Sequence, residues 1–143
     1  MRITCVCTGN TCRSPMAAAL LTLLLRLRGR TDMTVTSAGL AADGSPVAAN
    51  AVTAMAAMGA DISSHRSTPL TEELFRETDV FLVMSPAHRD ILLRAGAGAE
   101  QITVLGHGIP DPFGGPLEVY IATRDRLAAA LEEWLDTQPE EAP

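Results

Sequence analysis

The sequence predicts an α/β protein, a three-layer sandwich in which a four-stranded parallel sheet carries helices on both faces. Two observations lead to this fold class. Strand-like and helix-like segments alternate along the 143 residues, which is typical of parallel sheets. Residues 79–84 (DVFLVM) also form a continuous apolar run, as expected for a strand covered on both faces. The length suits one domain, expected over residues 1–137, with a frayed polar tail at residues 138–143.

Four segments have the composition of strands. Residues 2–7 (RITCVC) alternate in side-chain character and include β-branched residues, which favours a short strand. Residues 33–37 (MTVTS) are also β-branched, and Ala38-Gly39 follows as the expected end of that strand. The apolar run at 79–84 is the third strand, and residues 101–105 (QITVL) are the fourth.

The segments between these strands carry helix signals. Ser14 can cap a helix and Pro15 suits a first helical position, so the first helix is expected from there to Gly29. An Ala-rich helix over residues 46–58 should end at Gly59. The remaining helices are expected over residues 70–77, 86–94 and 116–137.

Charge and cysteine content exclude several classes of function. The net charge is -6 and all eleven basic residues are arginine, so the body lacks the positive face that nucleic acids or anionic membranes require. No segment approaches the run of about 20 apolar residues that spans a bilayer. The three cysteines are an odd number clustered within residues 5–12, which does not suit a disulfide framework. We therefore expect a cytoplasmic protein with working thiols, and any anion site in it must be local.

One short segment carries most of the chemical information. Cys7 is followed by five residues, then by Arg13 and Ser14, directly after the first strand and before the first helix. Main-chain N–H groups of such a loop, together with a bidentate guanidinium, can surround a tetrahedral oxyanion. The same positive field favours the thiolate form of Cys7, to which Ser14 can donate a hydrogen bond. The expected phosphate-binding residues are Thr8, Gly9, Asn10, Thr11, Cys12, Arg13 and Ser14.

Two other interpretations of this segment are weaker. A Cys-x5-Arg match alone arises easily by chance, but the preceding strand and the following helix make coincidence much less plausible. Within the loop, Gly9 is expected to allow a turn closed to most residues, and Asn10 to tolerate a left-handed backbone. A metal site lacks paired cysteine ligands and its histidines are scattered, so no metal and no cofactor are expected.

A second segment supplies the acid that such chemistry needs. Attack by Cys7 requires a group that protonates the leaving atom and later activates water. Asp111 stands between two prolines in a loop that follows the fourth strand, and this loop should emerge at the same sheet edge as Cys7. Taken alone, Asp111 would more often be a turn residue. Combined with the Cys-x5-Arg loop, it is the expected acid and base.

The chain resembles the low-molecular-weight protein phosphatase family. That family typically carries V-C-x-G-N-x-C-R-S-P near its N-terminus and D-P near its C-terminus, found here at residues 6–15 and 111–112. Residues 37–39 (SAG), 61–66 (DISSHR) and the strand at 79–84 extend the likeness over nearly the whole length. The resemblance implies a four-stranded parallel sheet, Cys7 as nucleophile, Arg13 as phosphate clamp and Asp111 as acid and base, without a metal. Phosphorylated proteins are the implied partners.

Details of the motifs bear on the substrate. Thr11 stands where the tyrosine phosphatases of the family usually have an aliphatic residue, and DPFGG at 111–115 replaces an aromatic pair after D-P. With TPLTEEL at 68–74, these features look most like the bacterial protein-arginine phosphatase branch. A hydroxyl at the rim suits a polar guanidinium better than a branched alkyl group does. Phosphoarginine is therefore favoured, with Thr11 and Phe113 as the specificity rim.

Other readings stay open at this point. Phosphotyrosine is the main alternative, because Phe113 supplies an aromatic edge. Arsenate reduction on the same fold is less favoured, since the thioredoxin-coupled type needs two further cysteines and none follows Cys12. Cys12 itself either packs behind the loop or traps oxidised Cys7 as a disulfide. The oligomeric state is not predicted.

Four residues outside the motifs receive ordinary structural interpretations. Cys5 is expected in the core and Trp134 as a packing anchor on the last helix. His65 either bonds the back of the phosphate loop or belongs to a solvated connection. His107 is expected at the rim of the site without a defined role.

Overall fold

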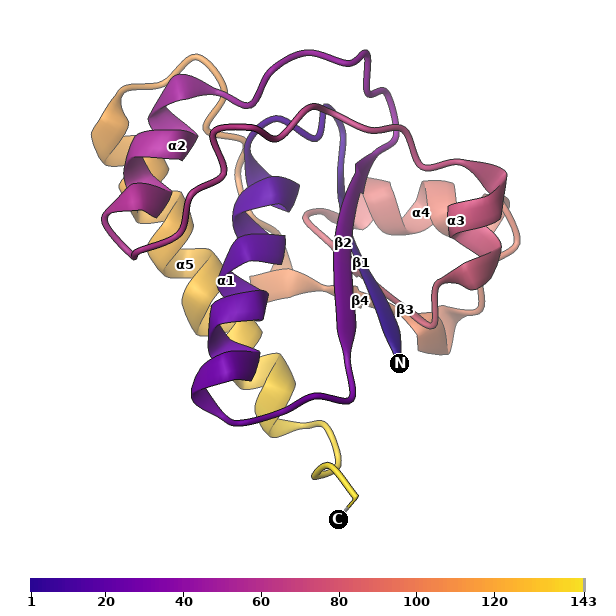
Figure 1. Cartoon of the computed structure of the whole chain (residues 1–143). Helices are drawn as coiled ribbons and strands as arrows, with labels where there is room; N and C mark the ends of the chain where they lie inside the picture. Colours follow the sequence, from indigo (N-terminus) through magenta and orange to yellow (C-terminus); the bar gives the residue numbers. More distant parts are fainter. Residues whose placement is uncertain (143) are drawn as a thin grey trace.

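Four parallel strands form the single sheet of the computed structural model, which describes residues 1–142. In order of position they are β2 (Thr34–Gly39), β1 (Arg2–Cys7), β3 (Val80–Val83) and β4 (Ile102–Val104). The strands β1 and β3 lie between the two edge strands, and Figure 1 views the sheet from its β2 edge, with β2 in front of β1. The predicted α/β class, with its parallel sheet, is confirmed.

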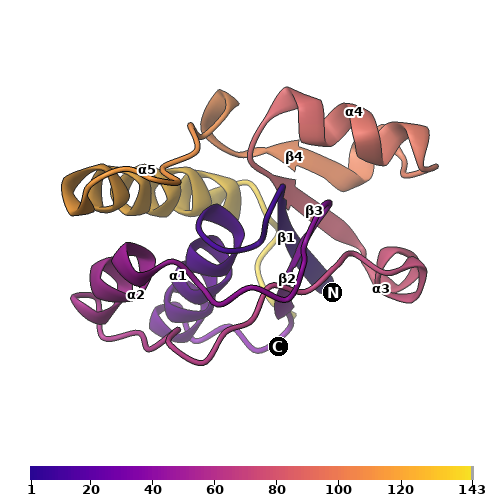
Figure 2. The same ribbon diagram turned by 90° about the horizontal axis from the view of Figure 1, so that it is seen from above.

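Helices cover both faces of this sheet. One face carries α1 (Arg13–Leu27), α2 (Ala49–Ala56) and α5 (Leu117–Asp136), and the other carries α3 (Glu72–Glu77) and α4 (Pro86–Arg94), as the view from above shows (Figure 2). Two short 3-10 turns flank β4, namely η1 (Ala99–Gln101) and η2 (Leu105–His107). The predicted three-layer arrangement is therefore present.

The period-2 alternation of the strands divides the core into two parts. Ile3, Cys5 and Cys7 of β1 point to the larger core beneath α1 and α5, while Val6 joins the smaller core on the α4 side. In β3, Phe81, Leu82 and Val83 are at most 1% exposed, so the strand is covered on both faces, as its apolar run predicted. Trp134 is buried in the larger core, in agreement with its predicted packing role.

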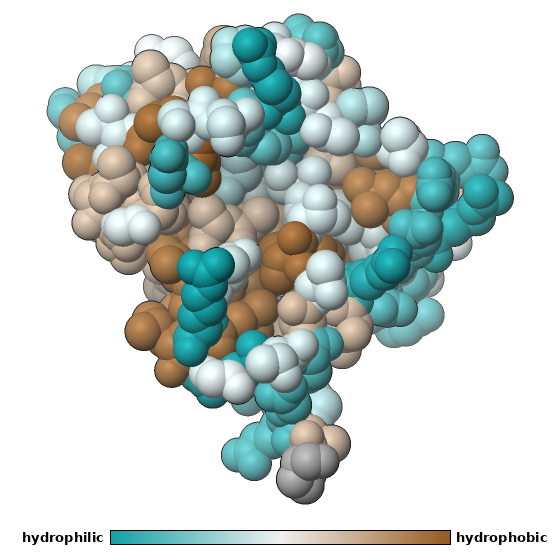
Figure 3. All heavy atoms as spheres, in the orientation of Figure 1, coloured by the Kyte–Doolittle hydropathy of each residue, from teal (hydrophilic) through white to brown (hydrophobic). Residues whose placement is uncertain are grey.

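The helix on the outer edge of the smaller core is mostly solvated. No residue of α3 (EELFRE) is fully buried. Figure 3 shows that the surface on the side of α3 is hydrophilic, in agreement with the charged residues of this helix. Thr71 caps this helix by accepting a hydrogen bond from the N–H of Leu74 at 3.1 Å. The helix therefore begins at Glu72, two residues later than expected, because Thr71 is its cap.

Two helix starts differ from expectation for identifiable reasons. Helix α1 begins at Arg13, and Ser14 does not cap it, because the Ser14 hydroxyl faces Cys7 and Asn10 instead. Pro15 is accordingly the third helical residue rather than the first. Helix α2 begins at Ala49, because Pro46 forms an isolated bridge with Arg66 and keeps the chain extended.

The fold gathers three loops at one edge of the sheet. The loops after β1, β2 and β4 all leave from the carboxyl ends of their strands, where ligands bind in open parallel sheets. Across residues 1–142, none of the helices has the length and apolar character needed to cross a membrane. The division into a domain at 1–137 and a tail stays a prediction; within that tail, Glu141 accepts hydrogen bonds from the N–H and hydroxyl of Thr31.

Candidate active site

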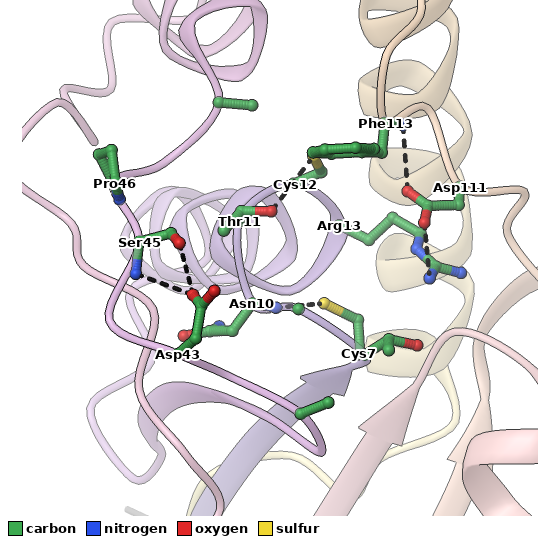
Figure 4. A pocket seen from close by; sticks show the side chains of 14 residues that line it. Cys7, Asn10, Thr11, Cys12, Arg13, Asp43, Ser45, Pro46, Asp111 and Phe113 are labelled. Carbon is green, nitrogen blue, oxygen red and sulfur yellow. Dashed lines mark hydrogen bonds and ion pairs between the residues drawn. The ribbon is translucent and has the colours of Figure 1, made fainter.

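A cavity of about 470 Å³ opens at the carboxyl end of β1. Its floor and one side are the loop from Cys7 to Arg13, and the loop carrying Asp111 and Phe113 forms a second wall (Figure 4). Ser14, the remaining predicted phosphate-binding residue, is fully buried behind the floor. The structure thus brings the predicted residues of both motifs to one place.

The sulfur of Cys7 receives two hydrogen bonds. The main-chain N–H of Asn10 donates to Sγ at 3.2 Å, and the Ser14 Oγ atom lies 2.9 Å from Sγ. Asn10 Nδ2 donates to the same Ser14 oxygen at 2.7 Å, so the Ser14 hydroxyl proton has two acceptors in reach, the sulfur at 2.9 Å and the Ala38 carbonyl oxygen at 3.5 Å. Both contacts bring a polar hydrogen-bonding group against the sulfur at the floor of the cavity.

Asn10 is the centre of the loop's internal support. It is fully buried and has a φ of 56°, the left-handed conformation that its residue type was expected to tolerate. Its Nδ2 atom also donates to Ser37 Oγ at 3.0 Å, and its Oδ1 atom accepts from the N–H of Thr68 at 2.8 Å. His65 Nε2 lies 3.0 Å from the Asn10 carbonyl oxygen. Of the two readings of His65, the contact with the back of the loop is therefore confirmed.

The glycine that the loop requires is Gly39 rather than Gly9. The φ of Gly9 is not positive, and a Cβ there would meet Thr11 Oγ1 at an ordinary 3.6 Å. At the end of β2, a Cβ on Gly39 would lie 2.8 Å from the carbonyl oxygen of Thr8 and 2.9 Å from Asn10 Cβ. The expectation for Gly9 is wrong, because Asn10 takes the left-handed conformation; the close approach occurs across the sheet, at Gly39.

Arg13 and Asp111 form the second part of the site. Arg13 is 7% exposed, and its Nη1 atom donates to the carbonyl oxygen of Ile109 at 2.9 Å. Its Nη2 atom lies 3.6 Å from Asp111 Oδ2, and the Asp111 side chain is 53% exposed. Asp111 Oδ1 accepts from the N–H of Phe113 at 3.1 Å. The loop from Ile109 to Phe113 thus bonds both the Arg13 guanidinium and the Asp111 carboxylate and keeps them close together.

A carboxylate on the opposite wall was not predicted. Asp43, Ser45 and Pro46 come from the connection between β2 and α2 and face Asp111 across the cavity (Figure 4). The hydroxyl and main-chain N–H of Ser45 donate to Asp43, and these bonds lower the pKa of Asp43 below its ordinary value. The Asp-Gly-Ser sequence at residues 43–45 indicates a turn. The neighbouring residues do not indicate that this turn lines the active-site cavity.

The other two cysteines are both buried. Burial, with a smaller contribution from Cys7, raises the pKa of Cys5 to about 12, which agrees with its predicted place in the core. Cys12 is buried with its Sγ 3.4 Å from the Tyr120 hydroxyl on α5, and burial raises its pKa as well. Cys12 thus packs against α5 and also lines the cavity, and its redox pairing with Cys7 stays a prediction.

The two residues of the expected specificity rim both line the cavity. Phe113 is 73% exposed at the cavity mouth. Thr11 lies on the phosphate loop, and its Oγ1 atom is 3.7 Å from Cys12 Sγ. His107, also expected at the rim, instead lines a separate hollow beside Trp134. That expectation is wrong, because the left-handed turn at His107 (φ 61°) carries this side chain toward α5.

One histidine with a contact to the loop was missed. His88 on α4 is buried, and its Nε2 atom lies 2.9 Å from Thr8 Oγ1. Burial and the charge of Arg13 lower the pKa of His88, while Asp111 acts in the opposite direction. Its place five residues after the end of β3 could have drawn attention to it, since that strand ends at the same sheet edge.

Fold and site together resemble those of a small cysteine-dependent phosphatase, and comparison with known proteins agrees. The model of the family described as low molecular weight phosphotyrosine protein phosphatase matches residues 2–142. A protein-arginine-phosphatase of Geobacillus stearothermophilus is 39% identical over 140 residues, covering 92% of this chain and 91% of the relative. A probable low molecular weight protein-tyrosine-phosphatase, EpsP, of Ralstonia nicotianae is 36% identical over 136 residues, covering 91% and 90%.

A solved structure gives the same result at the level of the fold. It is a cysteine-to-serine mutant of the YwlE arginine phosphatase with a phosphorylated active-site serine. This chain matches it with a TM-score of 0.87 at 35% identity, over 96% of this chain and 97% of that one. The chain belongs to the low molecular weight phosphotyrosine protein phosphatase family, and the resemblance that its motifs indicated is confirmed.

Proposed function

We propose that this protein is a protein-arginine phosphatase that works through a phosphocysteine intermediate on Cys7. The observation that supports this chemistry is the geometry of the loop from Cys7 to Arg13, which forms a cup at the floor of the cavity. At its floor, the Cys7 sulfur accepts a hydrogen bond from Asn10 and faces the Ser14 hydroxyl, while the Arg13 guanidinium lies beside Asp111. A phosphoryl group seated in this cup meets main-chain N–H donors and one arginine, which offset the negative charge that otherwise repels a nucleophile.

In the first step, the Cys7 thiolate attacks phosphorus while the bond from phosphorus to the arginine nitrogen breaks. Protonated Asp111 donates its proton to that leaving nitrogen, so arginine departs as its stable guanidinium cation rather than as an unprotonated guanidine, which is a poorer leaving group. The Asp111 carboxyl is 53% exposed at the cavity wall and can reach a leaving atom above the cup. Cys7 is left phosphorylated and Asp111 ionised.

In the second step, Asp111 takes a proton from a water molecule whose oxygen attacks the phosphorus. The bond from sulfur to phosphorus breaks, inorganic phosphate leaves, and Cys7 returns as a thiolate with Asp111 protonated. The Ser14 hydroxyl, 2.9 Å from Sγ, stabilises the departing sulfur. The acid and base roles of Asp111 thus balance over one turnover.

The observation that favours phosphoarginine is the pair of carboxylates on opposite walls, Asp111 and Asp43. Arg13 is the only basic residue that lines this cavity within residues 1–142. A phosphoarginine side chain carries a guanidinium next to its phosphate, and this group pairs with carboxylates and with the Thr11 hydroxyl. The 39% identical relative is named as a protein-arginine-phosphatase, which supports the same choice.

Phosphotyrosine is the second candidate substrate. Phe113 is 73% exposed at the cavity mouth and offers a face on which an aromatic ring could stack. Arg13 and Cys7 would serve both substrates equally.

We further propose a cytoplasmic location, because a thiolate nucleophile with two neighbouring free cysteines is maintained in a reducing compartment.

The test compares matched peptides that carry phosphoarginine or phosphotyrosine at the same position. Wild type should hydrolyse the phosphoarginine peptide with the higher kcat/KM, and Thr11→Ile should lose that preference, because a hydroxyl contact of about 1–3 kcal/mol is replaced by an alkyl clash. A preference of wild type for phosphotyrosine would overturn the substrate assignment. An unchanged preference in Thr11→Ile would remove Thr11 from the rim.

The roles of the two central residues are tested by separate variants. Cys7→Ser should abolish turnover while it keeps the affinity for inorganic phosphate, because the donors of the loop are retained. Asp111→Ala should slow substrates with poor leaving groups far more than activated aryl phosphates such as nitrophenyl phosphate, whose leaving group needs no proton. Normal turnover by both variants would contradict the proposed mechanism.

A further inference from the structure

A buried histidine determines how one hydroxyl of the cavity is oriented. His88 lies in the first turn of α4 and is 4% exposed. Its Nδ1 atom accepts a hydrogen bond from the main-chain N–H of Met84 at 3.3 Å. A neutral imidazole carries one proton, and because Nδ1 is the acceptor here, that proton is on Nε2. His88 therefore donates to Thr8 Oγ1, 2.9 Å away.

The direction of this bond has a consequence for Thr8. A hydroxyl that accepts from an imidazole still has its own proton to donate. Thr8 is the first residue after Cys7 and lines the cavity together with Arg13 and Asp111. Within residues 1–142, His88 is the one residue that forms a hydrogen bond with the Thr8 hydroxyl. The proton of the Thr8 hydroxyl is therefore available to a ligand in the cavity.

We infer that Thr8 donates a hydrogen bond to a phosphoryl oxygen of the substrate and that His88 is the positioning residue that aims it. The inference rests on the proposed phosphatase function of the cavity. It adds a side-chain donor to the main-chain N–H groups of the loop and to the fork of Arg13. It also gives a role to a buried titratable group that the two-step mechanism does not use.

The electrostatic surroundings keep His88 in the form that this role needs. Burial and the positive charge of Arg13 lower the pKa of His88, against a smaller opposing effect of Asp111. A protonated imidazole would carry a second N–H at Nδ1, directly against the N–H of Met84. The neutral tautomer, with its proton toward Thr8, is therefore the form that fits this position at neutral pH.

The central experiment is a double-mutant cycle between Thr8→Val and His88→Asn. Valine has the shape of threonine without the hydroxyl, and Thr8→Val should lower kcat/KM for the phosphoarginine peptide about tenfold or more, with an unchanged melting temperature. Asparagine can still accept from Met84 but does not reach Thr8, so His88→Asn should cost a smaller factor. In the Thr8→Val background, His88→Asn should cause no further loss in kcat/KM, because its effect passes through the hydroxyl.

Conservative variants and a distant control separate this role from a structural one. Thr8→Ser restores the hydroxyl and His88→Gln restores a donor near the Nε2 position, so both should recover most of the wild-type rate. Thr123→Val removes a buried hydroxyl that bonds only within α5, to Val119, and should leave the rate unchanged. Independent, multiplying losses in the double variant, or a Thr8→Val enzyme as fast as wild type, would overturn the inference.

Binding of inorganic phosphate distinguishes failure of this inference from failure of the proposed function. Measured by calorimetry, Thr8→Val should bind inorganic phosphate about tenfold more weakly than wild type, whichever phosphorylated residue the enzyme prefers. If wild type binds phosphate but hydrolyses neither peptide, the proposed function fails while the donor role of Thr8 still receives its answer from the affinity. Equal affinities of wild type and Thr8→Val would overturn the donor role alone.

Discussion

At the scale of single residues, the phosphate loop depends on a glycine outside it. Gly39 ends β2, and the space a side chain would need there is occupied by the Thr8 carbonyl and by Asn10. The same Asn10 receives support from Ser37 and Thr68, so the loop is held from behind by β2 itself and by the connection that precedes α3. The shape of the cup is therefore set partly by residues that never contact a substrate.

Two glycine variants should separate these effects. Gly39→Ala places a Cβ 2.8 Å from a backbone oxygen, which cannot move aside cheaply, so we expect a loss of about 1–3 kcal/mol in the free energy of unfolding. Gly9→Ala meets only an ordinary contact at 3.6 Å and should unfold close to wild type. Urea unfolding of both variants measures the difference. Equal stabilities would show that β2 does not constrain the loop.

At the scale of elements, α5 connects the phosphate loop to the loop that carries the acid. The Tyr120 hydroxyl lies 3.4 Å from Cys12 Sγ, and the main chain of Gly114, on the loop that carries Asp111, lowers the pKa of this hydroxyl against the larger effect of burial. Burial raises the pKa of Tyr120, so the hydroxyl keeps its proton and can donate it to Cys12. Asn50 of α2 adds a second tie by donating to the Gly115 carbonyl oxygen at 3.2 Å. Helix packing thereby sets the distance between Cys7 and Asp111.

Tyr120→Phe should test this connection. The ring keeps its packing, but the hydrogen bond between the hydroxyl and Cys12 is lost, so the free energy of unfolding should fall by about 1 kcal/mol. Because the Asp111 loop loses an anchor, turnover of substrates with poor leaving groups should fall more than turnover of activated aryl phosphates. Steady-state kinetics on both substrate types measures this. An equal decrease for both would mean that Tyr120 supports the fold without positioning Asp111.

At the scale of the whole molecule, burial of a neutral histidine links stability to pH. The pKa of His88 is lowered from 6.5 in the folded state, so below that value the unfolded chain binds a proton that the folded chain does not. Stability from this group is therefore complete above about pH 6.5 and falls as the pH is lowered toward the folded-state pKa. Asp43 and Asp61 have lowered pKa values, so their contributions persist until the pH falls below their ordinary value of 3.8.

The free energy of unfolding should accordingly decrease in two stages on acidification. The first stage begins near pH 6.5 and belongs to His88, and the second begins below about pH 4 and belongs to the carboxylates. His88→Gln removes the titrating group and should flatten the first stage while leaving the second. Denaturant unfolding at intervals between pH 7.5 and 3.5 provides the measurement. An unchanged first stage in the variant would assign it to another group.

The sequence by itself determined the features that follow from neighbouring residues. Alternation in β1, the apolar run of β3 and the order of strands and helices predicted the parallel sheet, because burial patterns repeat along each element. The spacing of Cys7 and Arg13 predicted the cup for the same reason, since a strand, a tight loop and a helix are continuous in the chain. The start of α1 was predicted less accurately, because the Ser14 hydroxyl forms a hydrogen bond with Asn10 in the phosphate loop instead of capping the helix.

Only the tertiary structure decided which distant residues complete the site. Asn10 is supported by Ser37 and Thr68, which are 27 and 58 positions away, and Thr8 by His88, which is 80 positions away. Asp43 reaches the wall opposite Asp111 only because the loops after β2 and β4 emerge at the same sheet edge. Such contacts depend on how the layers pack rather than on local conformational preference, so no pattern along the chain encodes them directly.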